Sequence, residues 1–286
     1  MSPKSLTGSA RLADRFAALR QVRRRAFIPF IMTGDPSIAV TEALIPALAT
    51  AGADVIELGV PFSDPLADGP TIQRASARAL ANGVSLADVL RLVERAHRHC
   101  TVPIVLLSYY NPICRMGAKT FCQRAAAAGV SGVIVPDLPP EEGRELIGAA
   151  RQHGVATIFL LAPTSTPERV RLVNRAATGF IYYVSVTGIT GARKQLPHEL
   201  LQNLHRVRAR VRWPLCVGFG VSTPEQARRI AAAADGVIVG SAIVERMEKS
   251  RRSAIVPTVR RLVSSLAAAT HSIRKGKVLF QPPGIR

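Results

Sequence analysis

Short runs of β-branched and other apolar residues alternate along the chain with longer, alanine-rich runs whose apolar residues recur every three to four positions. A short apolar run is typical of a strand buried on both faces, and the longer period is typical of an amphipathic helix. The alternation predicts repeated strand–helix units around a parallel sheet. Eight strands are expected, the number of a closed barrel: Phe27–Thr33, Val55–Leu58, Ile104–Leu107, Gly132–Val135, Thr157–Leu160, Phe180–Val184, Leu215–Val217 and Gly236–Val239.

The helix boundaries carry signals of their own. In Thr223-Pro224, a hydroxyl residue that can cap a helix precedes a proline, which is favoured at the first helical position. Gly52 and Gly129 precede strands, where a left-handed residue just past a helix end is needed. An additional helix is expected over Ser9–Arg25, where it would cover the bottom of the barrel.

An open, doubly wound sheet would also alternate strands with helices. A dinucleotide-binding fold of that kind places a GxGxxG sequence after its first strand, and none follows residues 27–33. We therefore predict an α/β protein with a single (β/α)8 TIM barrel. Its expected organisation is an N-terminal helix and basic arm over 1–26, the barrel over 27–268, and a basic, disordered tail over 269–286.

The formal net charge of +19 is concentrated near the two ends of the chain. Residues 1–26 carry seven basic groups and one acidic group, and residues 249–286 carry nine basic groups and no acidic one. The remaining segment has a net charge of only +4, which is ordinary for an enzyme. Basic tails can contact acidic surfaces without sequence specificity, so we expect no specific nucleic-acid partner.

Membrane and secretory classes are disfavoured by the sequence. No apolar run reaches the ~18 residues that a membrane helix needs, and the four cysteines form no CxxC pair and follow no secretory segment. The arginine-rich residues 11–25 could mimic an organellar transit peptide, but they include Asp14 and lead directly into a strand. We predict a cytoplasmic protein with reduced thiols and no membrane partner.

Glu57 is the first candidate for chemistry, because reacting groups in such a barrel collect at the C-terminal ends of the strands. It lies near the end of the second strand in the otherwise apolar run Val55–Leu58. Burial disfavours the charged carboxylate and so favours a group that transfers protons near neutral pH. The alternative is a buried glutamate held by neighbouring hydroxyls or amides.

Two further carboxylates, Asp64 and Asp68, follow in the loop Val60–Pro70. Prolines at 61, 65 and 70 restrict the backbone, so at least one aspartate can be directed at the mouth of the second strand with little freedom to lose. With Glu57 they can form an acid/base set, although Asp-Pro and Asp-Gly are also common turn pairs.

Small residues at the ends of the last three strands predict a phosphate site. They lie in Thr187–Gly191, Gly218–Gly220 and Gly240-Ser241. Glycine lets backbone N–H groups approach an anion, and a helix that begins at Ser241 would add its positive end. Barrels frequently bind phosphate in this quadrant, whereas ordinary turn glycines would not need to cluster there.

Residues that other mechanisms require are missing from the strand ends. The lysines, at 4, 119, 194, 249, 275 and 277, leave a Schiff-base mechanism without its nucleophile. No cluster of His, Asp and Glu has metal-ligand spacing at the barrel top. We therefore expect general acid/base catalysis with no metal and no cofactor.

The segment Glu57–Gln73, ELGVPFSDPLADGPTIQ, closely resembles the signature of the tryptophan synthase alpha subunit family. The resemblance extends from about Phe27 to Met247, through Gly34–Pro36, Tyr109–Asn111, Pro136-Asp137, Ser185–Ala192, Gly218–Gly220 and Gly240–Ala242. It implies a lyase of tryptophan biosynthesis that cleaves indole-3-glycerol phosphate to indole and glyceraldehyde 3-phosphate. The indole would pass to a beta subunit in an α2β2 heterotetramer.

The resemblance also implies a role for each matching residue. Glu57 would protonate indole C3 and help to remove a glycerol hydroxyl proton, and Asp68 would stabilise positive charge at the indole N–H. The other implied roles are an indole pocket of Phe30, Leu107, Tyr109 and Tyr182, a phosphate site of Gly191, Gly220, Gly240 and Ser241, a lid containing Thr190, and a partner-facing surface with Pro61 and Asp64.

Two departures from the family pattern leave alternatives open. Met32-Thr33 replaces a threonine followed by a small or aliphatic residue, and the tails are unusually basic. A stand-alone indole-3-glycerol phosphate lyase would share the catalytic residues and differ in its lid and subunit-facing loops. A non-catalytic binding or regulatory barrel would use the basic tails, but intact Glu57 and Asp68 argue against it.

Overall fold

Eight parallel strands close into a barrel in the order of the sequence, with β8 paired to β1. The computed structural model describes residues 6–184, 198–218 and 220–273. All eight predicted strands are present, and their ends differ from the predicted ones by no more than a single residue. They are β1 Ala26–Met32, β2 Ile56–Gly59, β3 Ile104–Leu107, β4 Gly132–Ile134, β5 Ala156–Leu161, β6 Ile181–Val184, β7 Leu215–Gly218 and β8 Gly236–Val239.

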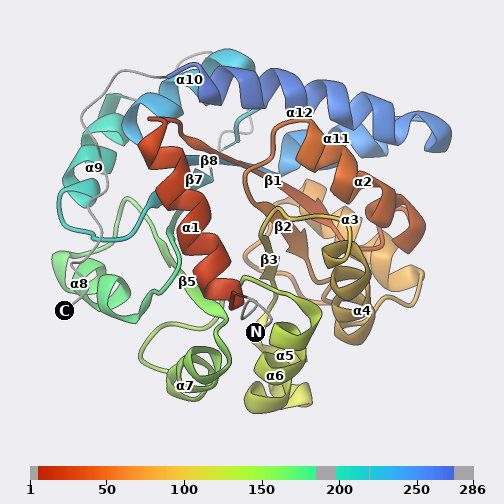
Figure 1. The fold of residues 1–286 in the computed structure, drawn as a ribbon, viewed down its shortest axis with the longest axis horizontal. Helices are drawn as coiled ribbons and strands as arrows, with labels where there is room; N and C mark the ends of the chain where they lie inside the picture. Colours follow the sequence, from red (N-terminus) through yellow and green to blue (C-terminus); the bar gives the residue numbers. More distant parts are fainter. Residues whose placement is uncertain (1–5, 185–197, 219, 274–286) are drawn as a thin grey trace, which may run out of the picture.

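Helices surround the barrel on its outside (Figure 1). The predicted end signals operate: the Thr223 hydroxyl accepts a hydrogen bond from the Gln226 N–H in a capping box, and Gly129 ends its helix with φ 89°. The helices are α1 Gly8–Gln21, α2 Ile38–Thr50, α3 Pro70–Ala81, α4 Leu86–His97, α5 Tyr110–Met116, α6 Ala118–Ala128, α7 Arg144–His153, α8 Pro167–Ala176, α9 His198–Arg208, α10 Pro224–Ala233, α11 Ser241–Glu248 and α12 Ile255–His271, with a 3-10 turn at Arg252–Ala254.

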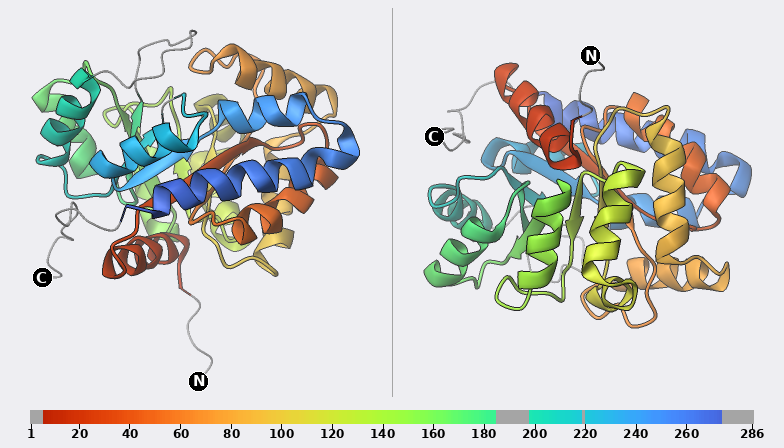
Figure 2. Two further views of the ribbon diagram at one scale, coloured as in Figure 1. Left: turned by 90° about the horizontal axis from the view of Figure 1, so that it is seen from above. Right: turned by 60° about the horizontal axis from the view of Figure 1, so that its bottom comes forward.

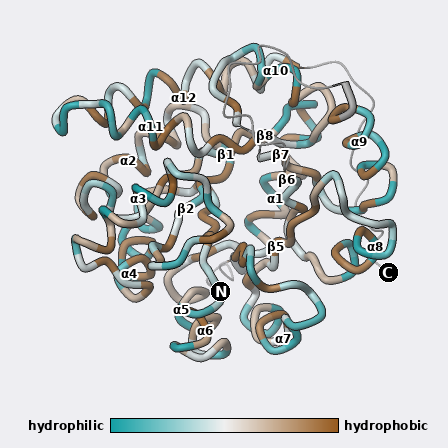
Figure 3. Tube along the Cα trace, turned by 180° about the vertical axis from the view of Figure 1, so that it is seen from behind, coloured by the Kyte–Doolittle hydropathy of each residue, from teal (hydrophilic) through white to brown (hydrophobic). Residues whose placement is uncertain are grey.

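Apolar side chains fill two separate layers of the molecule. One layer lies between the strands and the surrounding helices, and it includes Phe27, Ile56 and Leu58. The other lies inside the barrel, and it includes Ile28 and Val55. Successive side chains of a strand point to opposite faces, so each strand contributes to both layers. Figure 3 shows the resulting pattern, with hydrophobic strands at the centre and hydrophilic stretches on the outer helices.

Helix α1 covers the bottom of the barrel, as predicted. Its buried residues Leu12, Phe16 and Leu19 pack against the interior layer, and the ring centroid of Phe16 lies 5.9 Å from that of Phe180. In Figure 2 (left), α1 lies on one side of the barrel and α3 on the opposite side. The helix ends at Gln21 instead of Arg25, because Arg23 adopts a left-handed conformation with φ 54°.

The last helix extends beyond the predicted end of the barrel at residue 268. Helix α12 runs to His271, whose Nε2 lies 2.8 Å from a carboxylate oxygen of Asp54. The same Asp54 oxygen accepts the Phe27 N–H at 2.9 Å, and Arg24 donates to His271 at 2.8 Å. Of the basic residues near this end of the chain, Arg252 lies in the 3-10 turn and Arg260 and Arg261 lie on α12. The expected disorder of the final segment concerns residues 274–286, which lie outside the described ranges.

None of the helices in the described ranges combines the length and apolar character needed to cross a membrane.

Candidate active site

Glu57 points into the barrel from β2, opposite Phe30 of β1 and Val105 of β3. Its side chain is 0% exposed, and within the described part of the chain neither carboxylate oxygen has a hydrogen-bond partner. Burial, with an added contribution from the nearby charge of Asp68, raises the pKa of Glu57 to about 8. At neutral pH the group therefore holds a proton. Among these residues, no hydroxyl or amide holds the carboxyl group by a hydrogen bond, as a purely structural glutamate would require.

Asp68 is the second carboxylate at the mouth of the barrel, and its backbone is held both within its own loop and by the following helix. The Asp68 N–H donates to the Pro65 carbonyl at 3.0 Å, and the Gln73 amide donates to the Asp68 carbonyl at 2.9 Å. Partial burial raises the pKa of Asp68 and a hydrogen bond from Tyr109 offsets part of this rise, so that the pKa is about 6. Asp68 is therefore mainly ionised at neutral pH, while Glu57 is protonated.

One cavity of about 560 Å³ joins both carboxylates to the predicted phosphate end. Glu57 and Asp68 line it together with Gly220, Gly240 and Ser241, which follow β7 and β8. A single ligand can therefore contact the buried carboxyl group and the glycines, as the acid/base interpretation requires. Gly191 and Thr190 lie outside the described residues.

The predicted phosphate end lies at the beginning of α11. Gly240 precedes the helix, which begins at Ser241 as predicted. The first N–H groups of a helix have no partner within the helix and carry partial positive charge, so they can bind an anion.

Glycines on neighbouring strands leave room for the two aromatic side chains of the cavity. A Cβ atom at Gly59 would lie 2.7 Å from the ring of Phe30, and one at Gly218 would lie 2.4 Å from the ring and hydroxyl of Tyr182. Larger residues at either position would displace the ring that it faces. Both rings line the cavity with Leu107, so three of the four predicted indole-pocket residues meet there.

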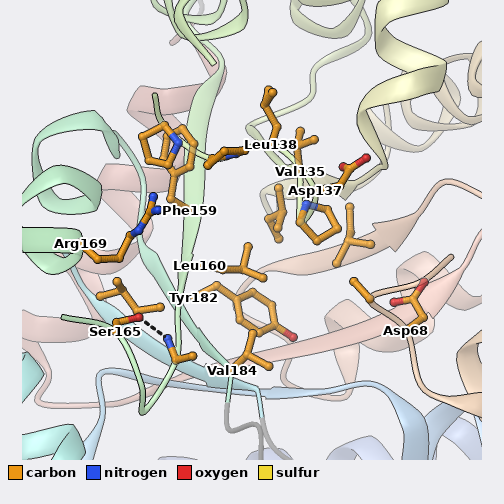
Figure 4. Close-up of a pocket in the computed structure, with 18 residues that line it drawn as sticks. Asp68, Val135, Asp137, Leu138, Phe159, Leu160, Ser165, Arg169, Tyr182 and Val184 are labelled. Carbon is orange, nitrogen blue, oxygen red and sulfur yellow. Dashed lines mark hydrogen bonds between the residues drawn. The ribbon is translucent and has the colours of Figure 1, made fainter. Parts of the chain in front are cut away.

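A second cavity of about 510 Å³ adjoins the first, and Asp68, Leu107, Tyr182 and Val184 line both. In Figure 4, Tyr182 projects into the space beside Leu160, with its hydroxyl on the side where Asp68 lies. Burial strongly raises the pKa of Tyr182, and the charges of Glu57 and Asp68 add to the effect. The hydroxyl therefore remains protonated and can act only as a neutral hydrogen-bonding group.

Tyr109 has a different position from the one expected of an indole-pocket residue. It does not line either of these two cavities. Its ring stacks on Phe62 at a centroid distance of 5.1 Å, and its hydroxyl accepts the Ala67 N–H at 2.9 Å while it donates to Asp68. Tyr109 therefore orients Asp68 from the side away from the cavity.

Only one of the two residues expected at a partner surface is accessible. Asp64 is exposed, whereas Pro61 is buried by the chain itself. Leu66, which the sequence analysis did not single out, is 91% exposed. An apolar side chain so fully in water marks the tip of this loop, and not its base at Pro61, as the part that can meet another protein.

The sequence analysis also missed Ile134 and Leu160, which line the second cavity. Both lie near the C-terminal ends of their strands, with side chains that face the barrel interior. The alternation of inward- and outward-facing residues along each strand could therefore have identified them from the sequence. The altered pair Met32-Thr33 has no direct place in either cavity: Met32 packs with Phe30 and Ala75, and Thr33 is fully buried. Across the three described ranges, no group of three or more His, Cys, Asp or Glu residues is placed to hold a metal ion.

Comparison with known proteins gives consistent matches. The family model described as "Tryptophan synthase alpha chain" matches residues 16–271. The tryptophan synthase alpha chain of Geobacter sulfurreducens is 52% identical over 260 residues, which cover 91% of this chain and 98% of that protein. The crystal structure of tryptophan synthase subunit alpha from Legionella pneumophila is 38% identical, with a TM-score of 0.86 over 92% of this chain and 99% of that one. A structure of tryptophan synthase from M. tuberculosis is 39% identical, with a TM-score of 0.83 over 93% of this chain and 99% of that one.

Proposed function

This chain belongs to the tryptophan synthase alpha chain family, and on that basis we propose that Glu57 and Asp68 divide the proton chemistry of its reaction. The chain is a carbon–carbon lyase of tryptophan biosynthesis, which cleaves indole-3-glycerol phosphate to indole and glyceraldehyde 3-phosphate. The observation that carries the proposal is the single cavity in which a protonated Glu57 and an ionised Asp68 face the start of α11.

The substrate has an apolar ring at one end and a phosphate at the other. We place the ring against Phe30, Leu107 and Tyr182, and the phosphate at Gly220, Gly240 and Ser241. Gly191 completes this phosphate site in the proposal, and Thr190 belongs to a lid whose closure would exclude water.

Cleavage then proceeds through two proton transfers at one carboxyl group. Glu57 donates its proton to indole C3, which becomes tetrahedral, and the positive charge that develops at the indole nitrogen is stabilised by the ionised Asp68. The Glu57 carboxylate next removes the proton of the adjacent glycerol hydroxyl. Its O–H electrons form the aldehyde carbonyl, while the electrons of the breaking carbon–carbon bond restore the aromatic indole. Glu57 ends protonated, and each transfer contributes about 10²- to 10⁴-fold.

The two shifted pKa values predict a bell-shaped pH dependence of kcat/KM. Activity requires ionised Asp68 and protonated Glu57, so kcat/KM should rise as the pH passes about 6 and fall as it passes about 8. Steady-state cleavage should be measured from about pH 5 to 9.5, the range that spans both limbs. A profile that is flat across this range would contradict the assignment of both groups.

For the partner, we propose a beta subunit in an α2β2 complex in the cytoplasm, contacted by the loop tip with Asp64 and Leu66. Both residues are exposed, and they lie shortly before Asp68 in the same loop. A partner that holds this tip therefore restrains the loop that carries a catalytic carboxylate.

A steady-state indole assay on the purified chain, with and without a tryptophan synthase beta subunit, tests this proposal. We expect slow release by the chain alone and an increase of about tenfold or more when the beta subunit is added, because positioning of reacting groups has effects of at least this size. Equally fast release without a beta subunit would instead establish a stand-alone lyase.

A further inference from the structure

The loop that carries Asp68 is fastened to α3, the helix that follows it. The Ser76 hydroxyl donates to the Phe62 carbonyl and accepts the Phe62 N–H, both at 2.9 Å. One turn earlier, Gln73 donates to the Asp68 carbonyl at 2.9 Å. Because both ends of the loop are bonded to the same helix, any shift of α3 would move the Asp68 carboxylate with it.

Helix α3 is held in turn by one arginine that contacts two other elements. The Arg78 guanidinium donates to both carboxylate oxygens of Asp35, at 2.7 and 2.9 Å. Asp35 lies in the turn after β1 and is only 2% exposed. A forked contact to a buried carboxylate fixes direction as well as distance, which a surface ion pair does not do.

The remaining nitrogen of Arg78 reaches α11. Its Nη1 donates to Glu248 at 2.8 Å, and Arg74 of α3 donates to the same carboxylate at 2.8 and 2.9 Å. These hydrogen bonds lower the pKa of Glu248 to about 2, so the group is ionised. Glu248 is the last residue of α11, where the helix dipole opposes a negative charge, and the two arginines supply the compensating positive charge.

We propose that Arg78 is a positioning residue that, through Asp35 and Glu248, sets the span between the Asp68 carboxylate and the phosphate-binding start of α11. The inference rests on the proposed function. Both ends of the substrate site belong to elements that meet at this arginine: the Asp68 loop through α3, and Ser241 through α11. The clamp lies outside the cavity and contacts no substrate.

The variant Glu248→Gln tests the inference with little risk to folding, because it leaves the buried Arg78–Asp35 contact in place and Glu248 is partly exposed. The matched control is Glu225→Gln: Glu225 also pairs with two arginines, Arg228 and Arg229, but all three lie on α10. The probes are inorganic phosphate and indole, which each occupy one end of the site, and 3-(indol-3-yl)propyl phosphate, which spans both ends and cannot be cleaved.

We expect Glu248→Gln to lower the affinity for the spanning ligand by about tenfold and to lower kcat/KM by about tenfold. Effects of this order are expected when reacting groups are displaced by less than about 1 Å. Phosphate and indole should bind within about twofold of the unchanged chain, and Glu225→Gln should match the unchanged chain throughout. Unaltered binding of the spanning ligand would overturn the inference. Equal weakening of all three ligands, with a lower melting temperature, would also overturn it in favour of plain structural support. If Glu248→Gln shows the expected changes in ligand binding but the unchanged chain never cleaves the substrate, the result counts against the proposed function and not against this inference.

Discussion

Glu57→Gln abolishes cleavage of indole-3-glycerol phosphate while the chain keeps its fold and its affinity for the spanning ligand. Glutamine fills the same space but cannot give a proton to indole C3 or take one from the glycerol hydroxyl. Because both transfers use this one group, we expect kcat to fall by about 10⁴-fold or more. Single-turnover measurement of indole formation separates this loss from any change in binding.

The same variant should be more stable than the unchanged chain. The pKa of Glu57 rises from 4.5 to about 8 on folding, so between these values the unfolded chain has released its proton and the folded chain has not. Stability contributed by this group is therefore lost as the pH rises from about 4.5 to 8. Glutamine remains neutral and avoids this loss, which amounts to roughly 3 kcal/mol at pH 7.

Thermal unfolding at about pH 5 and pH 8 checks the sign of this effect: the gain in melting temperature should be larger at the higher pH. Glu94→Gln is a suitable control, because Glu94 is exposed on α4, where it makes a surface ion pair with Arg98. A Glu57→Gln chain that cleaves substrate at a near-normal rate would refute the assigned role.

Asp68→Asn lowers kcat/KM by about 10²- to 10³-fold, the size found when one preorganised electrostatic contact to a developing charge is removed. Asparagine can still occupy the site and contact Tyr109, but it cannot neutralise the positive charge at the indole nitrogen. The acidic limb of the pH profile should disappear with the titrating group. The alkaline limb should move to lower pH, because the Asp68 charge is one of the causes that raise the pKa of Glu57.

The pH profile of kcat/KM for Asp68→Asn, compared with that of Asp14→Asn, tests both statements. Asp14 is exposed on α1, at the far end of the barrel, and its replacement should leave the profile unchanged. An acidic limb that persists in Asp68→Asn would show that another group titrates near pH 6.

Local patterns were sufficient to predict the strands and the buried position of Glu57 near the end of the second one. An apolar run between capped helices can form only a buried strand here, and the two-residue period places Glu57 on the same side as Val55. The start of α11 at Ser241 likewise followed from short-range signals. These features depend on neighbours within a few positions, so they can be predicted from the local sequence.

Contacts between distant segments decided the rest. Tyr109 supports Asp68, 41 positions away in the sequence, instead of facing the ring pocket. The end of α12 is held because His271 meets Asp54, 217 positions away. The raised pKa values of Glu57 and Asp68 depend on the solvent that the closed barrel excludes. The order of residues is enough to identify the groups that could do the chemistry and the strands on which they lie. Their protonation, their supports and their common cavity depend on the folded barrel, because burial and contact across the barrel arise when all eight strands close.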